Sequence, residues 1–176
     1  ETGKTHYYFV KRPGLTQTNG IRPGAANGVG RGCKSWNGKL YSVVGTKIYS
    51  GTTDLGVTLT TSTGLCGFAF TRPGVATQYL GINDGVKLYL ISTTDVVTTI
   101  TTNFPTPNTT DLEYMDGYFF VLKSNGTIWH CELDDPTTWD ASKFLTGMQY
   151  NGTAIGLAHQ NNIMVMLQDV ASPMFY

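Results

Sequence analysis

The chain has 176 residues and a formal net charge of zero, with 12 basic and 12 acidic side chains. Charged residues make up only 14% of it, while glycine (21) and tyrosine (10) are abundant. This composition is typical of β-rich, turn-rich folds rather than of helical or disordered chains, and it gives no bulk attraction to nucleic acid or membrane.

The first element that we predict is a strand over residues 6–10, followed by a loop that is dense in turn formers up to residue 32. Proline fixes φ and glycine accepts positive φ, so the Pro-Gly and Asn-Gly pairs of this loop predict turns. Such a loop separates the strand from the first blade, so the strand could complete a distant blade, as happens where a propeller closes into a ring.

A hairpin-like motif then returns about every forty residues, in segments 40–50 (LYSVVGTKIYS), 79–92 (YLGINDGVKLYLIS) and 118–133 (YFFVLKSNGTIWHCEL). Each copy places two strand-like runs around a turn. The turns fall at Gly45-Thr46, Asp84-Gly85 and Asn125-Gly126. A fixed period of this size indicates a repeat architecture, and four short strands per unit predict the blades of a β-propeller.

The remaining segments complete these blades. Residues 33–36 precede the Asn37-Gly38 turn as the first strand of the first blade, and the threonine-rich residues 52–63 supply its outer strand. The second blade runs from 65 to 102, and the third follows a linker at 103–110.

The third blade is expected to end in an acidic loop over residues 134–140, where Asp135-Pro136 reads as a turn before a short helical step at 140–144. The fourth blade begins at residues 153–159, turns at Asn161-Asn162 and continues toward the end of the chain.

We therefore predict an all-β fold of β-propeller blades with short antiparallel strands, with about four blades or parts of blades present, because no helical periodicity is sustained. Residues 1–32 form the N-terminal strand and turn-rich loop, and residues 33–176 form the propeller. The chain has no initiator Met and stops in a strand-like run, so we expect a fragment of a larger propeller. No apolar run has the length of a membrane span.

The sequence offers no clear carrier of catalytic chemistry. The histidines His6, His130 and His159 lie in strand-like runs, and no G-x-S-x-G motif supplies a nucleophile. We predict no catalytic residue, no cofactor and no enzyme activity.

No metal site or disulfide framework is predicted either. The chain has three cysteines at long spacings, without a C-x-x-C pair, and each lies in a strand-like segment where a small buried residue fits. We expect them to be reduced core residues. The acidic residues of segment 132–140 lack the alternating ligands and the glycine of a calcium loop, so they indicate a turn or a contact with a partner.

Charge is distributed unevenly along the chain. Residues 1–50 carry about +7 and residues 51–176 about −7, which suits oriented stacking against copies of the chain or against charged partners. The basic cluster could line a DNA channel, but we favour an acidic protein neighbour. The candidate contacts with a partner or channel are Lys11, Arg12, Arg22, Arg31, Asp134 and Asp135.

Segments 116–144 (DGYFFVLKSNGTIWHCELDDPTTWDASKF) and 151–167 (NGTAIGLAHQNNIMVML) resemble the tail hub protein of short-tailed bacteriophages, the podoviruses. This family is also called the nozzle or packaged-DNA stabilisation protein. Its pattern is a D-G-x-[FY] strand, a second strand ending near DP-x-x-[WF]-D-x-x-x-F, and an apolar strand pair. Segments 9–15 and 31–41 are also similar to the family. Segment 167–173 departs from the family pattern, and members of the family are longer than this chain.

The resemblance implies a non-enzymatic virion protein of the phage tail. Its relatives form a hexameric ring below the portal and its adaptor, extend the DNA channel, retain packaged DNA and carry fibres or spikes. The family brings no catalytic residues. The alternative is a glycan-binding or glycan-cleaving tail propeller, which needs converging carboxylates to cleave its substrate.

Overall fold

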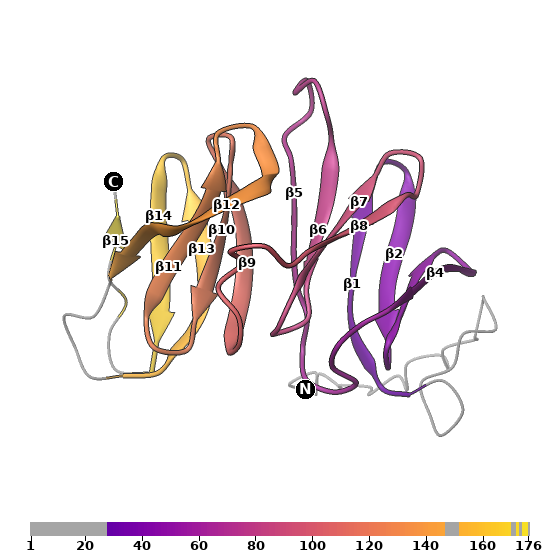
Figure 1. The fold of residues 1–176 in the computed structure, drawn as a ribbon, viewed down its shortest axis with the longest axis horizontal. Coiled ribbons are helices and arrows are strands. Elements are labelled where there is room, and N and C mark those ends of the chain that lie inside the picture. The colour runs from indigo at the N-terminus through magenta and orange to yellow at the C-terminus, as the bar shows by residue number, and fades with distance from the viewer. Residues whose placement is uncertain (1–27, 147–151, 170–171, 173, 176) are drawn as a thin grey trace, which may run out of the picture.

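The computed structural model describes residues 28–146, 152–169, 172, 174 and 175. Within these ranges the chain forms strands and turns in four antiparallel sheets that stand side by side (Figure 1). The predicted all-β fold with propeller blades is confirmed. Among the described residues no helix has the length and apolar character needed to cross a membrane. The predicted strand at 6–10 lies outside the described residues.

Each sheet is a blade built from consecutive strands in chain order. Blade I contains β1 (Gly30–Trp36), β2 (Lys39–Val44), β3 (Lys47–Ser50) and β4 (Thr53–Thr58). Blade II contains β5 (Gly67–Phe70), β6 (Tyr79–Asn83), β7 (Leu88–Ser92) and β8 (Val97–Ile100). Blade III contains β9 (Thr109–Met115), β10 (Tyr118–Lys123), β11 (Thr127–Glu132) and β12 (Asp135–Thr146). Blade IV contains β13 (Ala154–Gln160), β14 (Ile163–Gln168) and β15 (Met174–Phe175).

The forty-residue repeat of the sequence is the central hairpin of each blade. Its copies form β2–β3, β6–β7 and β10–β11, and their turns are the ones that the sequence predicts. Asn37 and Gly38 both have positive φ, 48° and 70°, so the Asn-Gly turn before β2 adopts a conformation that these residues reach at little cost.

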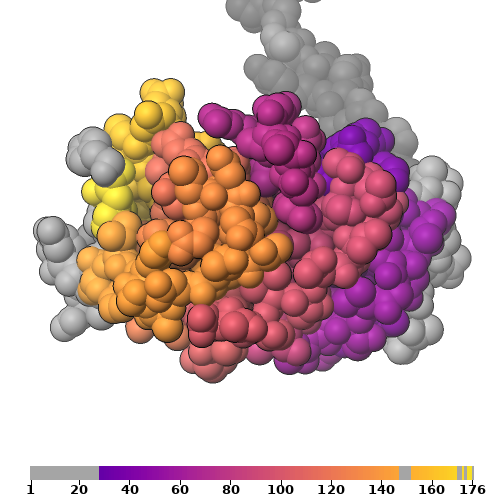
Figure 2. Space-filling view, turned by 45° about the horizontal axis from the view of Figure 1, so that its top comes forward, coloured from indigo at the N-terminus to yellow at the C-terminus, as the bar shows by residue number. Residues whose placement is uncertain are grey.

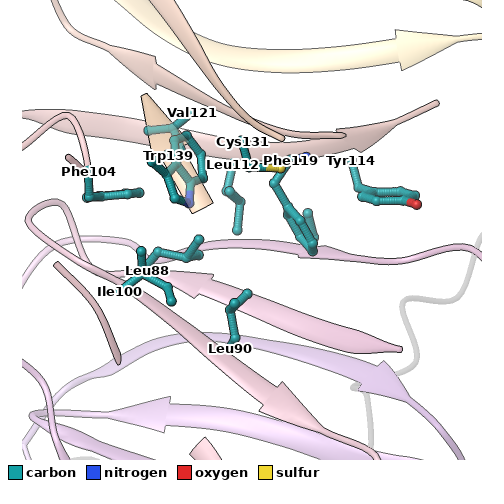
Figure 3. Close-up of a cluster of buried hydrophobic side chains, with 11 residues drawn as sticks. Leu88, Leu90, Ile100, Phe104, Leu112, Tyr114, Phe119, Val121, Cys131 and Trp139 are labelled. Atoms are coloured by element: carbon teal, nitrogen blue, oxygen red, sulfur yellow. Dashed lines mark hydrogen bonds between the residues drawn. The ribbon is translucent and has the colours of Figure 1, made fainter. Parts of the chain in front are cut away.

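Three apolar clusters join the four blades. One lies between blades I and II, one between II and III (Figure 3), and one between III and IV. Strand β7 supplies two of them, because Leu88 and Leu90 face blade III while Tyr89 and Ile91 face blade I. Fully burying such side chains contributes about 1.5–3 kcal/mol each, so the inter-blade faces are the core of this molecule.

The first strands of successive blades lie next to one another, with contacts of β1 to β5, β5 to β9 and β9 to β13. This is the arrangement expected of the inner strands of a propeller. The described sheets do not close into a ring, and blades I and IV stand at opposite ends of the series (Figure 1). Strand β1 begins at Gly30, slightly before the predicted start of the propeller at residue 33, and the division into 1–32 and 33–176 stays a prediction.

The end of the third blade differs from the prediction. Residues 135–146 form the outer strand β12 instead of an acidic loop and a helical turn at 140–144. Trp139 pairs with Cys131 and Phe144 pairs with Trp129, and the register shift between them lets residues 140–143 bulge outward. Because β12 is an edge strand, it also tolerates Pro136, which has no N–H to donate.

The cysteine prediction is also wrong in part. Cys131 is buried and Cys66 is partly buried, but Cys33 is exposed. Cys33 pairs with Ser42 on the face of blade I that points away from blade II, since the neighbouring Tyr41 and Val43 of β2 belong to the cluster between these blades. A strand position therefore does not imply a core position.

Candidate functional site

One hydrogen bond recurs at two of the three blade junctions, between blades II and III and between blades III and IV. A carbonyl of the turn between the second and third strands accepts a main-chain N–H from the first residue of the next blade. The pairs are Thr109 N to Gly85 O at 3.1 Å and Ala154 N to Ser124 O at 3.2 Å. At the junction of blades I and II, Cys66 N donates instead to Arg31 O of β1 at 3.0 Å. These hydrogen bonds satisfy polar main-chain groups where the chain crosses between blades.

A hollow runs along the first strands of the blades, and we call it the inner-strand groove. It has a volume of about 580 Å³ and crosses one strand from every blade. Lys34 of β1, Phe70 of β5, Glu113 and Tyr114 of β9, and His159 of β13 line it, together with Arg72 of the β5–β6 loop. That loop projects above the neighbouring blades (Figures 1 and 2).

The groove contains charges of both signs. Nδ1 of His159 lies 3.2 Å from Oε1 of Glu113, which joins blade IV to blade III. Nζ of Lys34 lies 5.2 Å from the centre of the Phe70 ring, within the range of a cation–π interaction. The groove is therefore lined by apolar, aromatic and charged side chains, a mixture that can bind a ligand.

Arg31, a predicted surface contact, lies in the interior and is only 1% exposed. Its guanidinium donates to the carbonyls of Thr61 at 2.6 Å, Gly64 at 2.9 Å and Gly45 at 3.1 Å, and to the Thr61 hydroxyl at 2.7 Å. The prediction failed because a lone arginine among turn residues gives no sign that main-chain carbonyls surround it. Arg31 holds the crossing from blade I to blade II in place.

Asp84 completes this polar network from blade II. It is 3% exposed, and its carboxylate accepts hydrogen bonds from the main chain of Thr60 at 2.8 Å and Lys87 at 2.8 Å and from the Tyr89 hydroxyl at 3.2 Å. Burial raises the pKa of Tyr89. The sequence indicated only a turn at Asp84, although aspartate side chains in turns commonly accept hydrogen bonds from nearby main-chain N–H groups.

Asp111 joins blades III and IV at their inner strands. Its Oδ2 accepts the main-chain N–H of Leu157 at 2.9 Å, and its Oδ1 accepts that of Leu112 at 2.8 Å. A Cβ on Gly156 would lie 3.2 Å from the same Oδ2, so the small residue leaves room for the carboxylate. Burial raises the pKa of Asp111, and these two hydrogen bonds oppose the rise.

Asp95 joins blades I and II away from the inner strands. It accepts hydrogen bonds from Lys39 at 2.6 Å, the Tyr41 hydroxyl at 2.6 Å and Ser50 at 3.3 Å. Burial alone would raise the pKa of Asp95, but the bonds from Lys39, Tyr41 and Ser50 together lower it. Burial, followed by the neighbouring carboxylate, raises the pKa of Tyr41 to about 12.

The two acidic candidates lie together at the β11–β12 turn. Asp134 is exposed, with a φ of 55°, and it lines a second hollow of about 280 Å³ beside Tyr114. Oδ1 of Asp135 accepts the N–H of Thr137 at 3.0 Å. The hydrogen bonds from Thr137 and Thr138 lower the pKa of Asp135. Lys11, Arg12 and Arg22 lie outside the described residues.

We also considered metal ligands, histidines and thiols in the part of the chain that the structure describes. No group of three or more histidine, cysteine or acidic side chains there has a geometry that could hold a metal ion. His130 packs against the rings of Tyr118 and Phe120, at 5.3 and 5.8 Å between ring centres, as expected of a structural histidine. Burial raises the pKa of the Cys131 thiol to about 11, which leaves it unreactive at neutral pH.

Solved structures with a similar fold are propeller-like and share little sequence with this chain. The computationally designed Ika4 protein has a TM-score of 0.59 at 14% identity, over 92% of this chain and 99% of that one. BamB from Moraxella catarrhalis has a TM-score of 0.53 at 11% identity, over 81% of this chain. YCF48 bound to D1 peptide has a TM-score of 0.57 at 13% identity, over 86% of this chain. The chain spans only 42% and 50% of the last two proteins.

The sequence itself identifies the family. No curated protein matches the chain at a significant level. Residues 1–175 match the phage stabilisation family described as bacteriophage P22 Gp10, beta-propeller. This family is structural and is not a known family of enzymes. The chain therefore belongs to the P22 Gp10 β-propeller family, and it is a structural component of the phage tail in the virion.

Proposed function

We propose that this protein is the hub or nozzle subunit of a short phage tail. Copies assemble into a hexameric ring below the portal and its adaptor, extend the DNA channel and retain the packaged DNA. The ring also anchors fibres or spikes. The family match over residues 1–175 is the observation that carries this proposal, and the protein has no catalytic role in it.

The architecture supports such an assembly role. Successive blades are held by apolar clusters and buried polar networks, which suits a part that bears load rather than one that changes shape. Propeller blades expose turns and loops on separate faces, so that one molecule can contact neighbours, appendages and DNA at different places.

The proposed contacts combine both signs of charge. Lys11, Arg12 and Arg22 contact an acidic neighbour or, without sequence preference, the DNA in the channel. Asp134 and Asp135 offer the acidic surface at the β11–β12 turn. Arg31 is left out of this set because its guanidinium is already saturated inside the molecule.

Negative-stain imaging of the full-length polypeptide, alone and mixed with its portal–adaptor complex, tests this proposal. We expect sixfold rings that bind the complex end-on. A monomer or trimer that degrades polysaccharide would contradict the proposal in favour of a glycan-cleaving propeller.

A further inference from the structure

The turn between β1 and β2 carries an exposed Asn-Gly pair. Asn37 and Gly38 are both exposed, with φ of 48° and 70°. A Cβ added to Gly38 would meet no atom within 4 Å, so the peptide group between the two residues has open space in which to rotate. The Asn37 side chain makes one long hydrogen bond to a described residue, in which Nδ2 donates to Thr93 O at 3.4 Å. This side chain is therefore only weakly held.

An Asn-Gly pair contains both partners of a covalent reaction, and asparagine is a thermolabile residue. The main-chain nitrogen of Gly38 attacks Cγ of Asn37, a new C–N bond closes a cyclic succinimide, and the side-chain amide leaves as ammonia with the proton of the attacking N–H. Water then opens the ring at either carbonyl and gives aspartate or isoaspartate. The net change consumes one water and releases one ammonia, so it needs no oxidant or reductant.

The nitrogen of Gly38 is available for this attack. Trp36 pairs with Lys39 across the hairpin, which leaves Asn37 and Gly38 as the two turn residues, and the N–H of Gly38 donates to no described residue. A main-chain nitrogen becomes nucleophilic only after it loses its proton, and an N–H without an acceptor loses it more readily. The charges next to the turn offset each other, because Lys39 pairs with Asp95 at 2.6 Å.

The second described Asn-Gly pair, in the turn between β10 and β11, differs at each of these points. Gly126 is buried, and its N–H donates to Lys123 O at 2.9 Å. Oδ1 of Asn125 accepts hydrogen bonds from the N–H of Thr127 at 3.2 Å and from its hydroxyl at 2.8 Å. The fold therefore holds both the nucleophile and the side-chain amide of this pair, whereas the dipeptide is the same as at Asn37.

We propose that Asn37 is a site of spontaneous deamidation in the folded chain, and that the fold protects Asn125 from the same reaction. A protein of the virion is not replaced after assembly, so the modified residue accumulates in the tail as the particle ages. This inference makes no use of the hub role, and its failure would leave that role intact.

The two products have different consequences for the junction of blades I and II. Isoaspartate adds a methylene group to the main chain between Trp36 and Lys39, which lengthens the turn and disturbs their pairing. Trp36 is 7% exposed and belongs to the apolar cluster between these blades. Aspartate keeps the turn, because it also adopts positive φ. We therefore expect isoaspartate to destabilise this junction more than aspartate does.

The test follows both sites in one sample. The 176-residue chain is aged in mildly alkaline buffer, folded or unfolded in urea, and then digested briefly with trypsin. Peptide 35–39 contains Asn37 as its only amide side chain, and peptide 124–143 contains Asn125 as its only one. In the folded chain we expect peptide 35–39 to convert about tenfold faster than peptide 124–143, into separable aspartate and isoaspartate forms. In urea the two peptides should convert at similar rates.

The variant Asn37→Asp separates the charge from the altered main chain. It should melt close to the wild type and should show no further conversion of peptide 35–39. The aged wild type, in contrast, should lose about 2–4 °C in Tm as isoaspartate accumulates.

Four results would overturn the proposal. Equal rates at the two sites in the folded chain would mean that the fold does not distinguish them. Conversion of Asn37 in urea but not in the folded chain would mean that the turn protects it. Aspartate without isoaspartate would exclude the succinimide route, and an unchanged Tm after conversion would exclude the effect on the junction.

Discussion

Blades I and II are joined differently from blades III and IV. Both junctions have a buried apolar cluster, and a main-chain hydrogen bond crosses each of them, from Cys66 to Arg31 at the first and from Ala154 to Ser124 at the second. The first adds a buried network around Arg31 and Asp84, in which one guanidinium binds three carbonyls from two loops. The second adds a single carboxylate, Asp111, that binds one N–H of the next blade.

The difference shows which part of the fold is general and which is local. Apolar burial between neighbouring blades recurs at each step, so it defines the repeat. The buried charges are specific to one junction, and they satisfy loop carbonyls that would otherwise lie in a low-dielectric interior. The first junction should therefore be more sensitive to a single substitution than the last.

The substitution Arg31→Met should cause the largest loss of stability, because it removes the buried network at the junction of blades I and II. It keeps much of the buried volume but leaves the carbonyls of Gly45, Thr61 and Gly64 without donors, so we expect a loss of about 3–5 kcal/mol in the free energy of unfolding. Urea denaturation of the 176-residue chain measures it. A loss below about 1 kcal/mol would mean that the network is dispensable.

Asp111→Ala should have a smaller effect, about 1–3 kcal/mol, because one buried N–H loses its acceptor. Hydrogen exchange should show β13 and β14 opening before blades I and II. Uniform exchange across all blades would contradict the comparison.

The substitution Asp111→Asn tests the junction of blades III and IV through the pH dependence of its stability. Burial raises the pKa of Asp111 in the folded chain above its unfolded value of about 3.9, so its contribution to stability falls as pH rises through the folded pKa. Thermal unfolding between about pH 4 and 7 should therefore vary less in Asp111→Asn than in the wild type. An unchanged pH profile would show that Asp111 does not titrate in this range.

Asp95→Asn addresses the part of the first junction that is closer to solvent, and we expect a loss of about 0.5–1.5 kcal/mol at neutral pH. The pKa of Asp95 is lowered in the folded chain, so its contribution is present above about pH 4 and disappears as pH falls through the folded pKa. The difference in Tm from the wild type should therefore shrink in acid. A constant difference would contradict a role for the charge.

Lys143→Gln is expected to have the smallest effect. Lys143 pairs with Glu132 at the surface of blade III, where solvent screens the interaction. Its Tm should match that of the wild type within error. A clear loss would mean that surface pairs also hold the blades together.

The strands of the repeat were predictable because residues close together in the sequence determine them. Asn37-Gly38 and Asp84-Gly85 each stand between apolar runs, and a turn of this kind fixes the hairpin around it. Strand β12 was not predictable in the same way. Asp135-Pro136 is a local turn signal, and pairing with β11 through Trp139 and Phe144 overrode it.

The candidate site depended on contacts between distant segments. Arg31 carries the charge of a surface residue, yet its partners lie in loops up to residue 84. Tyr114 and Asp111 are ordinary strand residues until blades II and IV pack on either side of them. Sequence patterns report which face of a strand is apolar, but they do not report which polar groups meet across blades.

A structure of the intact tail, determined from virions that carry this protein, tests the central claim most directly. We predict this chain in a sixfold ring next to the portal–adaptor, with blades I to IV side by side and the inner strands β1, β5, β9 and β13 adjacent as described above. Finding the chain in a peripheral fibre or spike, or its blades in a different order, would contradict the account.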